Sequence, residues 1–445
     1  MLSDLGIKKS NVMKRLQRRI VAALLPLLAL VMCYRFHIIF ELLSPPGSWC
    51  RDIAQDYLAA QAIDDGRDPY QPVSQLVRDY MGFEPLCAIS DHPTPHTPQA
   101  ITLISLFPRN SLLRLSRWWL AAQLGAMLTV SWLLWRFYLR SNRRSTFVLI
   151  LLMLCASLPG FSDLAYGNFS SILLLLFAVI FLIEADHLPV PRRLSKSCVV
   201  GVFLGLTLAL KTSGWVLLAY FFLTQRWRVV TWCLASLAVT VVAVESCRGQ
   251  LDLFRKFLEA GWHVRTYYSH TFYNQSIWSI GTRIFEGLEL TSVGLGVIAP
   301  PLVTLPQAAL PANLVIGGSV VMSFMLLACR SSSRDYTFAI LALLASIADP
   351  LSWEHNLLFS FLALIIMGKS IVRQAQALHL LLYLGLCLAW FAATPNWWSV
   401  SPGESRTGIA APLTGMVNVP IVLWAVILLS RLGPSTLSSA EKVDT

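Results

Sequence analysis

The sequence IVAALLPLLALVMCYRFHIIFE (residues 20–41) is followed closely by the polar stretch CRDIAQDYLAAQAIDDGRDPYQP (residues 50–72). The first run has the length of roughly 20 predominantly apolar residues that a helix needs to cross a bilayer. The second run would then lie at the membrane surface. We expect the other apolar runs of the chain to hold this polar stretch in place.

The composition of the whole chain indicates a membrane protein. Of its 445 residues, 56% are hydrophobic and 13% are charged, whereas soluble domains carry about 25% charged residues. The net charge of +11 indicates no nucleic-acid partner, because the basic residues stand in short clusters between apolar runs, as in cytoplasmic loops of membrane proteins. The clusters are Lys8-Lys9, Lys14-Arg15, Arg18-Arg19, Arg140 with Arg143-Arg144, Arg192-Arg193 with Lys196, Arg226 with Arg228, and Arg330 with Arg334.

Twelve apolar runs predict an all-α polytopic membrane protein. They are residues 20–41, 118–138, 145–160, 168–186, 198–210, 213–224, 229–245, 312–328, 336–349, 354–368, 378–393 and 411–430. An even number places both termini on one side, and the basic clusters make that side cytoplasmic. The expected parts are a basic N-terminus (1–19), a single transmembrane domain (20–430) with long outer loops at 42–117 and 246–311, and a disordered tail (431–445).

The outer loops are expected to carry helices that lie on the membrane surface. Residues 54–63, 73–81 and 251–265 have partly amphipathic patterns of that kind. Residues 290–310 are apolar but contain Pro300, Pro301 and Pro306. We interpret this last stretch as re-entrant or interfacial.

Lys211 stands alone between two short apolar runs, 198–210 and 213–224. Each run is shorter than an ordinary span, so two half-length helices meeting at residues 211–214 are expected. An ionisable residue inside apolar sequence indicates a functional site. The alternative is a lysine that extends its ammonium group to the membrane interface.

Asp52 and Asp56 are four residues apart, which places both carboxyl groups on one face of a helix. Two neighbouring carboxylates repel each other, so one of them tends to have a raised pKa, as suits a general base. The alternative for Asp52 is a capping box with Gln55 at the start of the helix. The residues leave open which of the two acids would be the base.

The cysteines and histidines do not indicate a metal site. The nine cysteines have no metal-like spacing, and only Cys50 and Cys87 fall clearly in an outer loop, where they could form a disulfide. His92 and His96 are four residues apart, but Pro93, Pro95 and Pro98 exclude a regular helix there.

Other unusual polar residues also fall on the predicted outer side, and an outward-facing catalytic cavity would explain this clustering. Asn168 and Asn274 stand in glycosylation sequons, but we interpret them as hydrogen-bonding groups of the cavity because both lie against the membrane. The polar residues of the outer side are Asp52, Asp56, His92, His96, Asn168, Lys211, His263, Arg265, His270, Asn274, Gln275, Arg283 and the segment 349–356.

Six motifs, taken in order over residues 50–368, resemble those of glycosyltransferase family 87. They are Asp52 to Ala60 followed by Gly66-Arg67-Asp68-Pro69-Tyr70; His96-Thr97-Pro98; Gly167-Asn168-Phe169-Ser170; Gly201 to Thr212; Asn274-Gln275-Ser276; and Asp349 to Asn356. Three positions depart from the family pattern. Asp56 replaces a tyrosine, Asp349 a serine, and Asn356 a histidine.

The resemblance implies a C-type membrane glycosyltransferase fold and the transfer of a sugar, mannose in the family, from a polyprenyl-phosphate donor to a lipid or glycan acceptor. Transfer would occur at the outer face of a bacterial inner membrane by an inverting mechanism. No metal or other cofactor is implied. The residues assigned are Asp52 as base with Asp56 as the alternative; Lys211, His355, Arg265 and Arg283 for the donor phosphate; and Tyr57, Tyr70, Asn168, Asn274, Gln275 and Trp353 for substrate binding.

Three other functions compete with this one. A transporter or flippase of lipid-linked sugars shares many spans and intramembrane charges, but transporters usually contain paired interrupted helices in repeated halves. A non-enzymatic membrane scaffold would not need an acid, a lysine and a histidine on one face. Transfer of another sugar, such as arabinofuranose, is the third.

Overall fold

The computed structural model describes residues 2–44, 47–83, 92–108, 110–271, 273–289, 298–374, 376–393 and 415–432. Apart from one short ribbon, these residues form helices and the loops that join them. The ribbon pairs β1 (Leu288–Glu289) with β2 (Ile298–Ala299) in antiparallel register. The all-helical character expected from the apolar runs is therefore confirmed.

Every apolar run assigned to a span contains a helix. The elements are α1 (Leu2–Leu43), α5 (Leu112–Leu133) with the π-turn η2 (Leu134–Tyr138), α6 (Arg144–Ala156), α7 (Leu158–Tyr166), α8 (Ser170–Glu184), α9 (Lys196–Leu210), α10 (Trp215–Leu223), α11 (Trp227–Arg248), α14 (Ala309–Arg330), α15 (Arg334–Ala345), α16 (Ser360–Gln374), α17 (Ala377–Phe391) and α18 (Asn418–Leu432).

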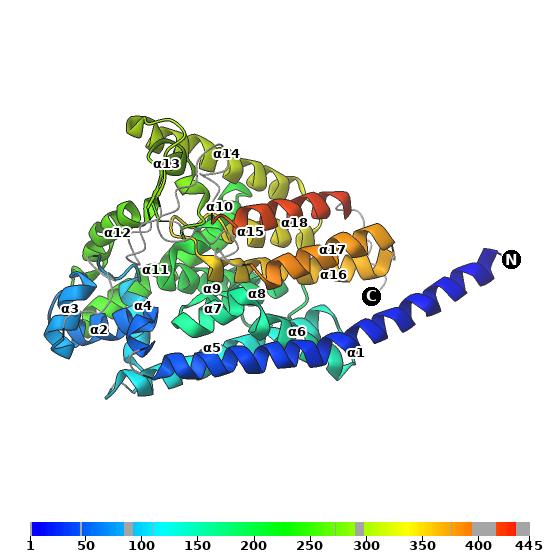
Figure 1. Ribbon diagram of the computed structural model, residues 1–445, viewed down its shortest axis with the longest axis horizontal. Coiled ribbons are helices and arrows are strands. Elements are labelled where there is room, and N and C mark those ends of the chain that lie inside the picture. Colours follow the sequence, from blue (N-terminus) through cyan, green and yellow to red (C-terminus); the bar gives the residue numbers. More distant parts are fainter. Residues whose placement is uncertain are drawn as a thin grey trace.

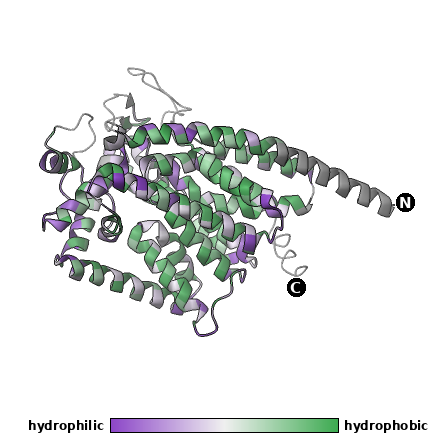
Figure 2. Ribbon diagram, turned by 90° about the horizontal axis from the view of Figure 1, so that it is seen from below, coloured by the Kyte–Doolittle hydropathy of each residue, from purple (hydrophilic) through white to green (hydrophobic). Residues whose placement is uncertain are grey.

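Five of the described helical segments are long and apolar enough to cross a membrane, or six if the bent pair α6–α7 counts as one span. The other apolar helices are shorter. In Figure 2 the middle of the bundle is coloured as hydrophobic, and the hydrophilic residues concentrate toward its ends. This is the fold of a polytopic membrane protein.

The helices of the outer loops gather at one end of the bundle. They are α2 (Asp52–Asp64), α3 (Val73–Met81), α4 (Pro98–Ser105) and α12 (Leu253–Ser269), with the shorter α13 (Ile280–Phe285) beside α14. Figure 1 shows α2, α3, α4 and α12 together, whereas α1 begins at the opposite end. The helices predicted at 54–63, 73–81 and 251–265 are confirmed, each within a few residues of its predicted bounds.

The prediction of one continuous span over residues 145–160 is wrong. The helix ends at Ala156 and continues as α7 at an angle of 61°. Ser157 has an extended backbone, and its side chain accepts a hydrogen bond from the backbone NH of Gly160, so it caps a new helix. Pro159 stands in the first turn of that helix, where a residue without an NH group is tolerated.

Four other expectations fall at least partly outside the described residues. Two of them are the disordered tail at 431–445, described only to residue 432, and the span at 411–430, described only from residue 415. Cys87 and residues 290–297 also lie outside the described residues, so neither the Cys50–Cys87 pair nor the first part of the stretch at 290–310 is described. The rest of that stretch contains β2 and the single turn η6 (Pro306–Ala308), and α14 begins at Ala309.

The interruption predicted near Lys211 is confirmed. The α9 helix ends at Leu210, Lys211 has an extended backbone (φ −157°, ψ 145°), and a short turn η3 (Thr212–Gly214) leads into α10. Before the break, α9 packs closely against α11. A Cβ atom on Gly201 would lie 2.5 Å from Cβ of Trp232.

We expect Gly205→Val to destabilise the protein. The new Cβ would lie 2.6 Å from the carbonyl oxygen of Cys233 and 2.7 Å from Cβ of Ser236, so α9 and α11 would have to separate. Overpacking of this kind lowers the free energy of unfolding by about 1–3 kcal/mol. The measurement is thermal unfolding of the purified protein in detergent. Gly125→Val is the control, because its Cβ would meet nothing within 4 Å. Equal losses in both variants would contradict this account of the packing.

Candidate active site

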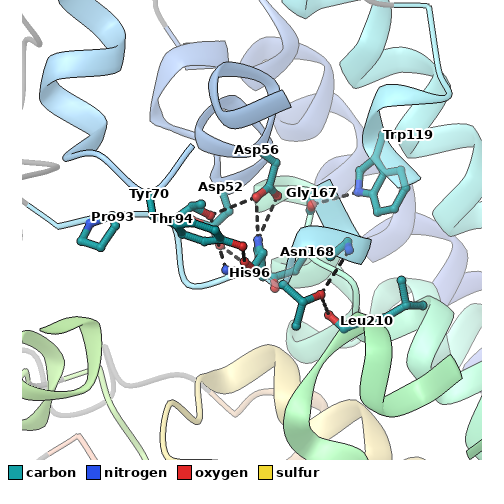
Figure 3. A network of polar contacts seen from close by, with 12 residues as sticks. Asp52, Asp56, Tyr70, Pro93, Thr94, His96, Trp119, Gly167, Asn168 and Leu210 are labelled. Atoms are coloured by element: carbon teal, nitrogen blue, oxygen red, sulfur yellow. Dashed lines mark hydrogen bonds and ion pairs between the residues drawn. The ribbon is translucent and has the colours of Figure 1, made fainter. Parts of the chain in front are cut away.

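Asp52 is the first residue of α2, and Arg51 occupies the N-cap position. The carboxylate of Asp52 accepts a hydrogen bond of 2.5 Å from Nδ2 of Asn168, at the start of the segment that leads into α8. The side chain of Asp52 therefore links the outer-loop helix to the spanning bundle (Figure 3). The capping-box interpretation of Asp52 is wrong, because the helix begins one residue earlier than a cap at Asp52 requires.

Gly167 lets the chain place Asn168 beside Asp52. Its φ of +76° is a left-handed conformation that favours glycine, and a Cβ there would lie 2.8 Å from Cβ of Ile53 on α2. The indole of Trp119 donates to the carbonyl oxygen of Gly167 at 2.8 Å, and Gln123 donates to that of Asn168 at 2.8 Å. The turn that presents Asn168 thus packs against Ile53 of α2 and is hydrogen-bonded to two side chains of α5.

Asp56 is fully buried one turn further along α2. Nδ1 of His96 donates to both of its carboxylate oxygens, at 2.8 and 2.9 Å, and the hydroxyl of Thr94 donates to one of them at 3.2 Å. Both oxygens of Asp56 are therefore bound to protein groups. Sequence reasoning noted His96 but did not assign it a role, because the proline-rich loop has no periodicity from which to predict a partner.

The loop that carries His96 is fastened to neighbouring elements. The phenol of Tyr70 donates to the carbonyl oxygen of His96 at 3.0 Å. The hydroxyl of Thr97 donates to the carbonyl oxygen of Ala209 at 2.5 Å, at the end of α9 next to Lys211. One short loop therefore holds α2 and the break after α9 together.

Lys211 lies in the same polar cluster as Asp52. Its ammonium group donates to Oδ1 of Asn356 at 3.2 Å. Its positive charge also acts on Asp52 and on Asp349. The positive charge at the helix break therefore acts on two acidic groups.

The ionisation of Asp52 reflects these surroundings. Burial raises the pKa of the Asp52 carboxyl group to about 6. The positive charges of His96 and Lys211 act in the opposite direction, and the negative charges of Asp56 and Glu354 add to the increase. Asp52 is thus mostly ionised at neutral pH and can still accept a proton in a slightly acidic range.

The segment 349–356 contributes further residues to the cluster. His355 is buried, and the charges of Lys211 and His96 reach it. The ring of Trp353 is nearly parallel to that of Tyr273, with the ring centres 6.3 Å apart. It meets the ring of Tyr268 edge to face, with the centres 5.3 Å apart. The structure therefore brings Asp52, Lys211 and His355 together from three distant parts of the chain.

Asn274 and Gln275 hold this segment in place. The side chain of Asn274 donates to the carbonyl oxygen of Pro350 at 3.2 Å and accepts from the NH of Ser352 at 3.3 Å. The backbone NH of Gln275 donates to the carbonyl oxygen of Ser352 at 2.6 Å, and its side chain accepts from the start of α18. All the hydrogen bonds described for Asn274 and Gln275 are thus made with other groups of the protein.

Three other predicted residues make their described contacts with other groups than Asp52 and Lys211. Arg283 is fully buried and donates to the carbonyl oxygens of Thr271 and Asn274. Arg265 lies on α12 with its guanidinium 5.8 Å from the centre of the Trp262 ring. Tyr57 is buried on α2 and its hydroxyl accepts from Gln61 at 2.9 Å. No contact recorded for the described residues joins Arg265 to Asp52 or Lys211.

Within the described ranges, no group of three or more His, Cys, Asp or Glu side chains is arranged to hold a metal ion.

The fold is that of a helical membrane protein. Its buried cluster of ionisable groups lies at one end of the bundle and supplies the polar side chains that a reaction needs. The model of glycosyltransferase family 87 matches residues 95–353, more than half of the 445 residues. The chain belongs to glycosyltransferase family 87 and is a membrane glycosyltransferase. No curated protein and no solved structure matches it. The match begins after Asp52 and ends before His355.

We expect Arg51→Gln to lower the stability of the protein. The buried guanidinium donates to the carbonyl oxygens of Ala165 at 2.5 Å and Leu164 at 2.8 Å, at the end of α7. Because glutamine is shorter, these acceptors would lose a charged donor, at a cost of about 2 kcal/mol each. The melting temperature in detergent should fall.

Arg67→Gln is the matched control, since Arg67 is exposed and makes a surface ion pair with Asp79. Such pairs contribute under about 1 kcal/mol. A melting temperature of Arg51→Gln equal to that of Arg67→Gln would contradict the proposed link between α2 and α7.

Proposed function

We propose that this glycosyltransferase moves a hexosyl group, mannose by family resemblance, from a polyprenyl-phosphate sugar to a hydroxyl group of a lipid or glycan acceptor. One observation supports the proposal above the others. The charge of an ammonium group (Lys211) acts on a carboxylate (Asp52) within a single cluster at one end of the membrane bundle. Transfer from a phosphate-linked donor needs a base for the acceptor and a positive charge for the departing phosphate.

The proposed site faces the periplasm of a bacterial inner membrane, in a C-type fold of twelve spans within one domain (20–430). The basic residues expected to be cytoplasmic support this orientation. Lys196 and Arg334 both pair with Asp186, and Arg226 pairs with Glu184, at the end of α8. Asp52 contacts Asn168, at the opposite end of the same helix.

The reaction is a single displacement that inverts the anomeric carbon. The acceptor oxygen attacks that carbon, its proton passes to Asp52, and the bond between the carbon and the phosphate oxygen breaks. The electron pair of that bond leaves with the polyprenyl phosphate. Since phosphate is a good leaving group, it needs no proton, but its developing charge needs a nearby cation.

Asp52 is proposed as the base in preference to Asp56. Both oxygens of Asp56 are bound by His96 and its side chain is fully buried, so it is poorly placed to take a proton from an acceptor. Asp52 is only partly buried, and its described hydrogen bond uses one oxygen. We assign Asp56 and His96 to positioning and to the electrostatics of Asp52.

Lys211 and His355 are proposed to bind the donor phosphate. Asn168 would orient Asp52, and Tyr70, Asn274 and Gln275 would position the surrounding loops through the contacts described above. Arg283 supports the loop before α13 through its backbone contacts. Tyr57 and Arg265 keep no direct role in this proposal. Trp353 remains a candidate for substrate contact.

We expect Asp52→Asn to abolish sugar transfer, because asparagine cannot accept the proton. The purified protein is offered a panel of radiolabelled polyprenyl-phosphate sugars, including mannose and arabinofuranose, together with a membrane extract, and the product is identified. The rate should fall by about 10²–10⁴-fold, with unchanged thermal unfolding.

The matched control is Asp65→Asn, an exposed acid just past the end of the same helix, which should leave transfer unchanged. Transfer by Asp52→Asn at the rate of this control would rule out Asp52 as the base. Failure of the wild-type protein to transfer any sugar of the panel would count against the proposed donor class.

The pH dependence of transfer should report the ionisation of Asp52. A base works in its deprotonated form, and burial raises the pKa of Asp52 to about 6, so the rate should fall as the pH drops through about 6 and level off above it. His96→Gln removes a positive charge that lowers this pKa, so the acidic limb should move to higher pH.

The control for this shift is His92→Gln. His92 lies in the same loop, but its hydrogen bonds go to the carbonyl oxygen of Pro93 and to the hydroxyl of Tyr268, whereas His96 binds Asp56. The pH–rate profile is measured for all three proteins. An acidic limb that stays in place in His96→Gln would show that His96 has only a structural role.

A further inference from the structure

The segment 349–355 carries three buried polar atoms that have no hydrogen-bond partner among the described residues. They are Oδ2 of Asp349, Oε2 of Glu354 and Nε2 of His355. Asp349 and His355 are each only 4% exposed. A buried polar atom without a partner costs free energy, more so when it is charged. Three such atoms within seven residues indicate a place where a ligand supplies the missing partners.

Each of the two acidic side chains makes a hydrogen bond through its other oxygen. Oδ1 of Asp349 accepts from the NH of Leu351 at 3.4 Å, and Oε1 of Glu354 accepts from the hydroxyl of Ser162 at 3.0 Å. The hydroxyl of Ser352 donates to the carbonyl oxygen of Ser346 at 2.7 Å and fixes the chain between them. One oxygen of each acid is thus bound within the protein, and the other is left for a ligand.

These acids belong to the polar cluster around the proposed base. The charge of Glu354 acts on Asp52, and the charges of Lys211 and His96 act on Asp349. The described hydrogen bond of the Lys211 ammonium goes to Asn356, so Lys211 does not occupy Oδ2 of Asp349. Lys211 thus acts on both Asp349 and the proposed base, so a ligand atom held by Asp349 would belong to the same polar cluster.

The chemistry of these atoms selects the kind of ligand group. An ionised carboxylate oxygen only accepts hydrogen bonds, so its partner must be a donor. A phosphate would be repelled, and an apolar chain would leave the oxygens unpaired. Hydroxyl groups are donors that match both acids. The neighbouring aromatic face of Trp353, beside Tyr268 and Tyr273, suits the apolar face of a sugar ring.

We propose that Asp349 and Glu354 form the subsite that binds the hydroxyl groups of the sugar being transferred. This inference rests on the proposed function. By its resemblance to the family, Asp349 stands where the pattern has a serine. A carboxylate can accept hydrogen bonds from two hydroxyl groups through its two oxygens, whereas a serine has a single oxygen.

The test compares the binding of two soluble probes to the full chain in nanodiscs by calorimetry. One probe is a short-chain polyprenyl-phosphate mannose, and the other is the same polyprenyl phosphate without sugar. Asp349→Asn and Glu354→Gln should each weaken binding of the first probe by about tenfold to a hundredfold, because a hydrogen bond to a charged group is lost. Binding of the second probe should not change.

Monodeoxy forms of the mannose probe locate the hydroxyl group. Wild-type protein should bind one of them more weakly than the parent probe, whereas Asp349→Asn should bind that form and the parent probe equally. Asp335→Asn is the matched control, since Asp335 is a buried acid at the other end of α15 that contacts Tyr138. It should retain wild-type affinity for both probes.

The outcomes separate this inference from the proposed function. Wild-type binding of the sugar probe with unchanged affinity in Asp349→Asn and Glu354→Gln would overturn the subsite alone. An equal loss for both probes would also overturn it, because the acids would then act on the lipid phosphate site or on folding. Absence of binding of either probe to the wild-type protein would overturn the proposed donor class and this subsite with it.

Discussion

The hydrogen bond between Asn168 and Asp52 is the contact on which the arrangement of the site depends. It joins the first outer-loop helix to the start of α8. The contact is possible because Gly167 adopts a left-handed conformation against Ile53 and because Arg51 holds the end of α7. Without these neighbours the carboxylate would lie in a loop at the membrane surface with no fixed position relative to Lys211.

Polar groups collect where helices are interrupted. The α6–α7 bend at Ser157, the break at Lys211 and the segment 349–356 all leave backbone groups that no continuous helix satisfies. Irregular backbone at membrane depth is tolerated only where it is buried in protein or lines a polar cavity. The same interruptions that would weaken a simple bundle thus supply the hydrogen-bonding groups of the site.

Some of this arrangement could be predicted from the sequence and some could not. Apolar runs predict helices because burial in lipid requires them, and a lysine between two short runs predicts the break at Lys211. The pairing of Asp56 with His96 could not be predicted, because residues 92–97 have no period and the contact spans 40 residues. The buried contacts of Arg283 and Asn274 depend on loops whose packing has no local signal. The bend at Ser157 could be predicted from the sequence, since a serine followed by Leu-Pro matches the start of a capped helix.

The most direct test of the central claim is a cryo-electron microscopy structure of the protein in nanodiscs with a non-transferable analogue of a polyprenyl-phosphate sugar. The account predicts a phosphate oxygen within about 4 Å of the Lys211 ammonium, with the anomeric carbon on the side of Asp52 and the sugar hydroxyls toward Asp349. A phosphate bound elsewhere, such as among Lys196, Arg226 and Arg334 at the opposite end of the bundle, would contradict it.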